Sequence, residues 1–125
     1  MIRIFVFSYS GDAAEAVACV RCARMAVPCA SMTVVDDAAN PVHEDVAAAL
    51  REMGTDYVQS CWPRNGNLRG PDCIRGILQE MCREAEDDDI LVKIDCDTAL
   101  LDDGWLRWME DHPACLLYTS DAADD

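Results

Sequence analysis

The sequence predicts an α/β sandwich built on a largely parallel sheet, and three observations predict it. Short runs rich in β-branched and aromatic residues alternate with longer segments in which apolar residues recur every three or four positions. The resulting order is strand–helix four times over, which favours parallel strands joined by right-handed helical crossovers. The strand segments are apolar along most of their length, as expected for strands that are covered on both faces.

The first strand–helix unit has clear boundaries. Residues 2–9 form an apolar strand, and the glycine that follows breaks it. Asp12 is the predicted helix N-cap, with Glu15 as its capping-box partner. Apolar residues at helical spacing fill residues 13–25, and Pro28 ends this amphipathic helix.

The second unit begins with a strand over residues 32–35. Asn40 is placed as the N-cap of the next helix, with Pro41 at its first position and Gly54 at its C-cap. Residues 56–60 then form a third, shorter strand.

The remaining elements follow a loop over residues 61–72 that is rich in glycine and proline. Residues 74–81 carry apolar side chains at i, i+3, i+4 and i+7, which predicts a helix. The acidic run 84–89 is interpreted as a solvated turn, because it lacks the ligand spacing of an EF-hand calcium loop. A fourth strand over residues 90–94 precedes an apolar, helical segment at 100–109.

Composition narrows the function. The chain has 125 residues, enough for one domain or part of one, and 51% of them are apolar. Against 10 Lys and Arg stand 24 Asp and Glu, a net charge of −14 that would repel a nucleic-acid backbone. No apolar run approaches the roughly 18 residues that cross a bilayer, and the start does not resemble a signal peptide. We therefore expect a protein without a transmembrane segment that handles phosphates, if at all, through a bound cation.

The eight cysteines do not form a recognisable metal site. Cys19 and Cys22 make a C-x-x-C motif, but they lie in a predicted helix and no second pair supplies the other two zinc ligands. With no secretion signal, we expect the cysteines to be reduced and to behave as small apolar residues. A thiol-rich metal-binding or protein-interaction domain is the alternative.

Polar side chains gather where three predicted strands end: Ser8 and Tyr9, Asp36 and Asp37, and Asp95 with Asp97. In open α/β sheets, ligands bind beyond the carboxyl ends of the strands. Asp95 and Asp97 would project to one side if extended geometry persists, with Cys96 on the other. Two neighbouring carboxylates suit a hard divalent ion, Mg²⁺ or Mn²⁺, completed by substrate phosphates. The alternative is that these residues only cap turns at the surface.

Three segments resemble the nucleotide-binding half of a family 2-type glycosyltransferase with the GT-A fold. Residues 5–10 (FVFSYS) are similar to the ending of its first strand, residues 34–39 (VVDDAA) to its Val-Asp-Asp-Gly-Ser motif, and residues 91–100 (LVKIDCDTAL) to its D-x-D strand. The resemblance covers residues 1–114 in order. It implies a Rossmann-like, three-layer GT-A sandwich that is truncated, and a cytoplasmic enzyme or one at the inner face of the membrane.

The resemblance also implies roles for the polar residues. Ser8 and Tyr9 would flank the base, with the Tyr9 ring available for stacking, and Asp37 or Asp36 would accept a hydrogen bond from a ring N–H. Arg64 or Arg69, in the loop before the third helix, would contact the nucleotide or its phosphates.

The D-x-D motif would hold the metal. Asp95 would approach the ribose or the metal, and Asp97 would bind the metal that bridges the diphosphate. The implied donor is a UDP- or GDP-linked sugar and the acceptor is unknown. The metal would offset the charge that develops on the departing nucleoside diphosphate.

The last eleven residues, 115–125, resemble a translated sequencing adapter, with a native acidic tail as the alternative. We therefore expect residues 1–114 to be an N-terminal fragment. Inverting members of the family use a carboxylate further along the chain as general base. On this interpretation the intact parent enzyme transfers the sugar, while the fragment only binds the donor.

Other interpretations stay open. Residues 8–11 faintly resemble a phosphate-binding loop, which would suit a flavodoxin-like module that binds a nucleotide or FMN without glycosyl transfer. Lys93 is expected to pair with nearby carboxylates. Trp105, Trp108 and Met109 are expected in the core rather than against a sugar.

Overall fold

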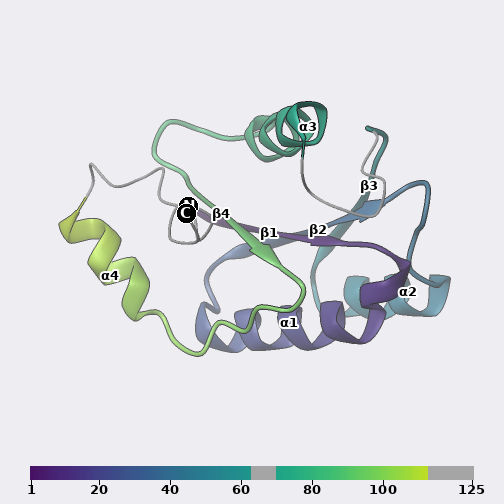
Figure 1. Cartoon of the computed structure of the whole chain (residues 1–125). Helices are drawn as coiled ribbons and strands as arrows, with labels where there is room; N and C mark the ends of the chain where they lie inside the picture. The colour runs from purple at the N-terminus through teal and green to yellow at the C-terminus, as the bar shows by residue number, and fades with distance from the viewer. Residues whose placement is uncertain (63–69, 113–125) are drawn as a thin grey trace.

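The computed structural model describes residues 1–62 and 70–112 and confirms the predicted α/β architecture. Its elements are, in order, β1 (Ile2–Ser8), the short 3₁₀ turn η1 (Ser10–Asp12), α1 (Ala13–Ala26), β2 (Ser31–Asp37), α2 (Glu44–Glu52), β3 (Asp56–Ser60), α3 (Pro71–Cys82), β4 (Ile90–Asp95) and α4 (Gly104–Asp111). The four strands form a parallel sheet in the order β3-β2-β1-β4. Helices α1 and α2 lie on one face of the sheet and α3 on the other (Figure 1).

The strand register brings the predicted polar positions together. In the pairing of β1 with its neighbours, Ser8 lies opposite Asp36 of β2, and Phe7 lies opposite Asp95 of β4. Asp37, the last residue of β2, lies opposite Ser60 of β3. All four strands therefore end at the same side of the molecule, which we call the carboxyl end of the sheet.

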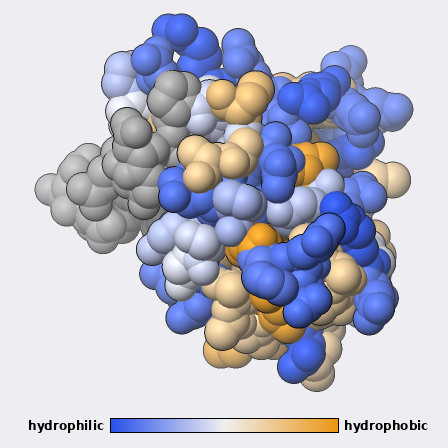
Figure 2. Space-filling model, turned by 90° about the vertical axis from the view of Figure 1, so that its right-hand side faces the viewer, coloured by the Kyte–Doolittle hydropathy of each residue, from blue (hydrophilic) through white to orange (hydrophobic). Residues whose placement is uncertain are grey.

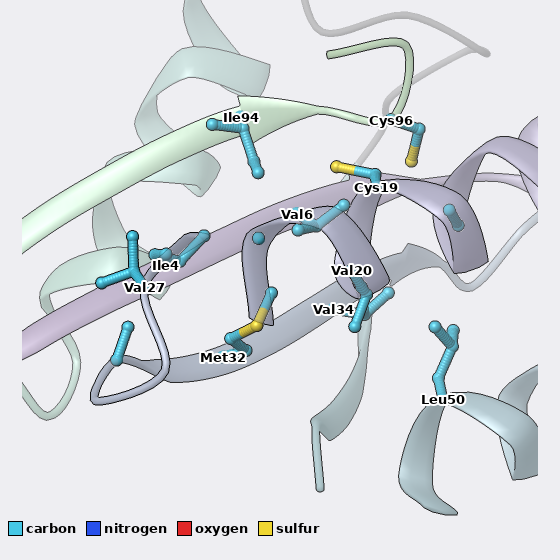
Figure 3. Packing of buried hydrophobic residues seen from close by; sticks show 13 residues of the cluster. Ile4, Val6, Cys19, Val20, Val27, Met32, Val34, Leu50, Ile94 and Cys96 are labelled. Carbon is cyan, nitrogen blue, oxygen red and sulfur yellow. The ribbon is translucent and has the colours of Figure 1, made fainter. Parts of the chain in front are cut away.

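Two hydrophobic clusters hold the layers together. The larger lies between the sheet and α1, and it includes Ile4, Val6, Val20 and Val34 (Figure 3). Its side chains exclude water from one face of β1 and β2, since these four residues are fully buried. The second cluster lies under α3 and contains Phe5, Phe7, Val35, Cys73, Ile77 and Met81. We call this second side of the sheet the α3 face.

Helix α3 approaches the sheet through a tight contact at Gly76. A Cβ atom on Gly76 would lie 2.4 Å from the ring of Trp62, so only glycine leaves room for the indole. The partly buried Trp62 ring packs on the second cluster just after β3. This contact fixes the side of α3 that faces the sheet.

One predicted helix start is wrong, and one predicted capping bond is absent from the described structure. Helix α2 begins at Glu44 rather than at Pro41, and the ring of His43 accepts its first capping bond, from the Asp45 amide at 3.2 Å. The cause is a long-range contact, because the amide of Val42 donates to the buried carboxylate of Asp36 at 2.8 Å and holds the chain out of helical geometry. At α1, Asp12 precedes the helix as predicted, but its side chain makes no capping bond.

In the last two helices, fewer apolar residues are buried than their helical spacing in the sequence predicts. On α3, Ile77 is buried but Ile74 and Leu78 are about half exposed. Helix α4 has no buried residue: Trp105 packs partly on the larger cluster, whereas Trp108 is 49% exposed and stacks on His112. The expectation that Trp108 belongs to the core is therefore wrong. A helix at the end of the sheet has only one neighbour on which to bury an apolar face.

The acidic run between α3 and β4 is tied to the start of β1. Asp89 accepts a hydrogen bond from Arg3 at 2.7 Å and another from the amide of Glu86 at 2.9 Å, and it pairs with the amino group of Met1 at 3.2 Å. The Glu86 amide and then the Arg3 guanidinium lower the pKa of Asp89 from 3.8 to about 2. This carboxylate is thus part of a structural ion pair at the opposite, amino end of the sheet.

Within residues 1–62 and 70–112, no helix combines the length and the apolar character needed to cross a membrane.

Candidate functional site

The carboxyl end of the sheet carries six of the predicted site residues, four of them within three adjacent strands and Tyr9 and Asp97 just after two of these strands. Successive side chains of a strand point to opposite faces, so these residues divide into two sets. Ser8 and Asp36 point toward α1 and α2. Asp37 and Asp95 share the α3 face with Val35, Phe7 and Leu91. Viewed from this end of the molecule, hydrophilic residues predominate, with smaller hydrophobic patches between them (Figure 2).

Asp36 is fully buried, and both of its carboxylate oxygens are already bonded. Oδ1 accepts from the hydroxyl of Ser8 at 2.9 Å. Oδ2 accepts from the Val42 amide at 2.8 Å and from the phenol of Tyr57. A buried carboxylate is tolerated when donors satisfy it in this way. Asp36 therefore ties β1, the loop before α2 and β3 together at the base of the site.

Tyr57 is a part of this network that sequence reasoning did not single out. Burial and then the hydrogen bond to Asp36 raise the pKa of Tyr57 above 10.0, so the phenol remains a donor throughout the neutral range. The Arg51 guanidinium lies 4.8 Å from the centre of the Tyr57 ring. In the sequence, Tyr57 could be noticed only as the single aromatic residue of a short strand. Its position next to Asp36 depends on the strand order, which the sequence alone does not give.

The carboxylate of Asp37, unlike that of Asp36, is only partly hydrogen-bonded. It is only 2% exposed, and Oδ1 accepts from the Ala39 amide at 3.0 Å. Oδ2 is buried and, within the described residues, has no hydrogen-bond partner. A buried carboxylate oxygen without a donor is unfavourable.

Asp95 and Asp97 are both exposed, while Cys96 between them is buried. The extended geometry ends at Asp95, since the Thr98 amide donates to the Asp95 carbonyl at 3.0 Å and closes a turn. Lys93 pairs with Asp95, with 2.8 Å from Nζ to Oδ1, which confirms the predicted pairing. Among the described residues, the carboxylate of Asp97 has no hydrogen-bond or ion-pair partner.

The floor beneath these carboxylates is made by two thiols. Cys96 donates to the carbonyl of Phe7 at 3.0 Å, and Cys19 of α1 lies 3.6 Å from the carbonyl of Asp95 (Figure 3). Burial, and then the charges of Cys22, Asp95 and Asp97, raise the pKa of Cys19 to about 11. Cys19 is thus a neutral thiol. All seven cysteines of the described part are free, as expected, although Cys29, Cys61 and Cys82 are exposed rather than half-buried.

The loop that follows β1 is closed on itself. The Tyr9 ring folds over Gly11, where a Cβ atom would lie 2.7 Å from the ring. The Ser10 amide donates to the carbonyl of Asn40 at 2.8 Å, and the Asp12 amide to the carbonyl of Tyr9 at 2.9 Å. The loops after β1 and β2 are therefore joined. Arg64 and Arg69, the two candidate phosphate contacts, lie outside the described residues.

Asp95 and Asp97 are the residues at this end of the sheet that could hold a hard divalent cation, and they would need further oxygen ligands. Across residues 1–62 and 70–112, no three His, Cys, Asp or Glu side chains come close enough to hold a metal alone. Asp95 and Asp97 offer two carboxylates, which is the protein contribution typical of a Mg²⁺ or Mn²⁺ ion completed by phosphate oxygens and water. Cys19 and Cys96 stay below the surface, which leaves an all-oxygen site.

A separate hollow of about 730 Å³ lies on the α3 face at the amino end of the sheet. Arg3, Arg51 and Arg83 line it, but so do Asp56 and Glu80, together with Glu84. Positive and negative side chains are balanced there, and Arg83 already pairs with Glu80. This hollow is far from the D-x-D motif along the strands and has no clear ligand preference.

The fold is similar to that of a known glycosyltransferase. The structure aligns with a crystal structure of an active-site mutant of LgtC, with a TM-score of 0.50 and 20% sequence identity. The alignment covers 86% of this chain and 41% of LgtC, so the chain spans less than half of that protein. No protein-family model and no curated protein matches the sequence. The chain therefore has a Rossmann-like α/β fold similar to that of this glycosyltransferase.

Proposed function

We propose that this chain is the nucleotide-sugar-binding part of a glycosyltransferase of the family 2 type. The observation that carries the proposal is the asymmetry of the carboxyl end of the sheet. Asp36 is fully satisfied inside the protein, whereas Asp37 keeps a buried oxygen without a donor, and Asp97 stands exposed and unpaired among the described residues. The glycosyltransferase fold supports this interpretation.

The proposed roles follow from the contacts of each residue. Asp37 accepts a hydrogen bond from a ring N–H of the base through Oδ2, since Oδ1 is held by the Ala39 amide. Asp36 and Ser8 position Asp37 rather than touch the nucleotide, because their polar atoms are bonded to each other. The exposed side of the Tyr9 ring is available for stacking against the base.

Asp95 and Asp97 would hold Mg²⁺ or Mn²⁺ together with the diphosphate. When bound, the cation supplies charge stabilisation for the departing nucleoside diphosphate. The protein contributes two oxygen ligands on a short turn that is fixed by the Thr98 amide and by the buried Cys96. Fixing the backbone of this turn before the ligand arrives reduces the ordering cost of binding.

Transfer of the sugar to an acceptor is the proposed activity of the whole enzyme. A general base that activates the acceptor hydroxyl is not assigned among the described residues. The binding of the donor can be tested without it.

The test is calorimetric titration of the chain with UDP and with GDP, each with and without Mn²⁺. We expect binding of one of them to depend on Mn²⁺ and to weaken by about 100-fold in Asp97→Asn, which removes a metal ligand. The matched control is Asp87→Asn, which removes the same charge from an exposed position at the amino end of the sheet.

Two results would contradict the proposal. Neither diphosphate binds in the presence of Mn²⁺, or the binding is independent of the metal and unchanged in Asp97→Asn. Tight binding of FMN would instead favour the flavodoxin-like alternative. Against that alternative stands the loop after β1, whose Ser10 and Asp12 amides already donate to backbone carbonyls and are not free to bind a phosphate.

A further inference from the structure

We infer that Lys93 couples the metal to the diphosphate, by occupying a metal ligand when the nucleotide is absent and binding a phosphate oxygen when it is present. The inference rests on the proposed function and concerns how the same site is regulated. Lys93 is the single lysine of the 125 residues, and it lies two positions before Asp95 on the same face of β4.

The position of Lys93 is defined by two contacts. Its ammonium group lies 2.8 Å from Oδ1 of Asp95 and 5.7 Å from the centre of the Phe7 ring. The Lys93 side chain is 33% exposed and that of Asp95 is 52% exposed. The pair is therefore open to solvent, so it can exchange partners at little cost.

In the free protein, this ammonium group works against the metal. It covers one of the two oxygens of Asp95 and places a positive charge next to the point where a divalent cation would bind. A metal ion on its own must displace the ammonium group and remain close to it, which lowers the affinity for the metal alone.

When a diphosphate is present, the positive charge of Lys93 favours binding instead of opposing it. Its oxygens would bring negative charge next to the metal, within reach of the Lys93 side chain. The ammonium group released from Asp95 can donate to one of them, as a charge-assisted hydrogen bond. The metal and the nucleotide thus bind more tightly together than either binds alone.

The experiment measures Mn²⁺ binding by electron paramagnetic resonance, alone and with saturating UDP or GDP, whichever binds. Lys93→Met keeps the aliphatic stem over Phe7 and removes the charge. We expect it to bind Mn²⁺ alone about fivefold more tightly than the wild type. In the presence of Mn²⁺, it should bind the nucleotide about tenfold more weakly.

Two further variants separate this role from a structural one. Arg107→Met removes a positive charge from another exposed ion pair, with Asp103, and should change neither affinity. Lys93→Arg retains the charge and should restore most of the coupling between metal and nucleotide. General damage to the site would weaken both ligands together and would not be rescued by arginine.

The outcomes also distinguish this inference from the proposed function. If the wild type binds Mn²⁺ with a nucleotide but Lys93→Met changes both affinities in the same direction, or neither, the coupling role of Lys93 is refuted and the glycosyltransferase proposal stands. If the wild type binds no nucleotide with Mn²⁺, both are refuted.

Discussion

The carboxylates at the two ends of the sheet differ in how many hydrogen-bond and ion-pair partners they have. At the amino end, Asp89 has a 5% exposed side chain that is bonded to Arg3, to the amino terminus and to the Glu86 amide. At the carboxyl end, Asp37 has a buried oxygen without a donor in the described part of the chain, and Lys93 is the cation that pairs with the D-x-D motif. The first arrangement stabilises the fold, whereas the second, on the proposed function, keeps acceptors for a ligand.

The comparison is sharper between the neighbours Asp36 and Asp37. Both are almost fully buried at the end of β2. Among the described residues, the carboxylate of Asp36 accepts three hydrogen bonds, from two side chains and an amide, while the carboxylate of Asp37 accepts one. Because the strand continues through both residues, they face opposite sides of the sheet. Burial alone therefore does not indicate whether an acid is structural or functional, and its hydrogen-bond partners do.

The largest effect is expected for Asp36→Ala. Removing the carboxylate leaves the Ser8 hydroxyl, the Val42 amide and the Tyr57 phenol without an acceptor, so we expect the free energy of unfolding to fall by about 3 kcal/mol. Tyr57→Phe removes a single donor and should cost about 1 kcal/mol. Urea unfolding followed by circular dichroism measures both. Equal stability of Asp36→Ala and the wild type would contradict the structural role of Asp36.

Asp37→Asn should have the reverse effect. The amide oxygen of asparagine can keep the Ala39 hydrogen bond, and a buried negative charge without a donor disappears, so stability should be unchanged or higher. Binding of the nucleotide diphosphate with Mn²⁺ should weaken by about tenfold, because an NH₂ group would face the ring N–H of the base. Calorimetry and urea unfolding of the same sample test the two expectations. A loss of stability without a loss of binding would exchange the roles of Asp36 and Asp37.

The smallest effect is expected at Asp89 and appears only in acid. Because the folded-state pKa of Asp89 is lowered from 3.8 to about 2, its contribution to stability is complete above pH 4 and is lost as the pH falls toward 2. Asp89→Asn should be less stable than the wild type at neutral pH, and this difference should shrink between pH 4 and pH 2. The urea midpoint measured across this range is the readout. A constant difference over the whole range would indicate that the ion pair with Arg3 is not its source.

The sequence predicted the sheet because its strands are marked by local composition. The third strand has the predicted bounds, Asp56–Ser60, and the first and fourth differ by one residue at their carboxyl ends. The start of α2 could not be predicted, because the contact that delays it joins Val42 to a carboxylate on another element. Local capping signals at Asn40 and Pro41 were outweighed by this tertiary hydrogen bond.

The sequence predicted where the candidate site lies, but not which role each of its residues has. The polar residues after the first, second and fourth strands do gather at one end of the sheet. Their division into a supporting pair, Ser8 with Asp36, and a set on the α3 face, Asp37 with Asp95, depends on the strand order and on the exact last residue of β2. Tyr57 can bond to Asp36 of this pair only because β3 lies next to β2.

The indole of Trp62 occupies the space that a side chain at position 76 would take. The packing of this ring consequently restricts the rotation of helix α3 about its own axis. Its first turn, which begins at Pro71, is thereby held in a constant direction. An alanine at position 76 would therefore force either the Trp62 ring or the helix to move.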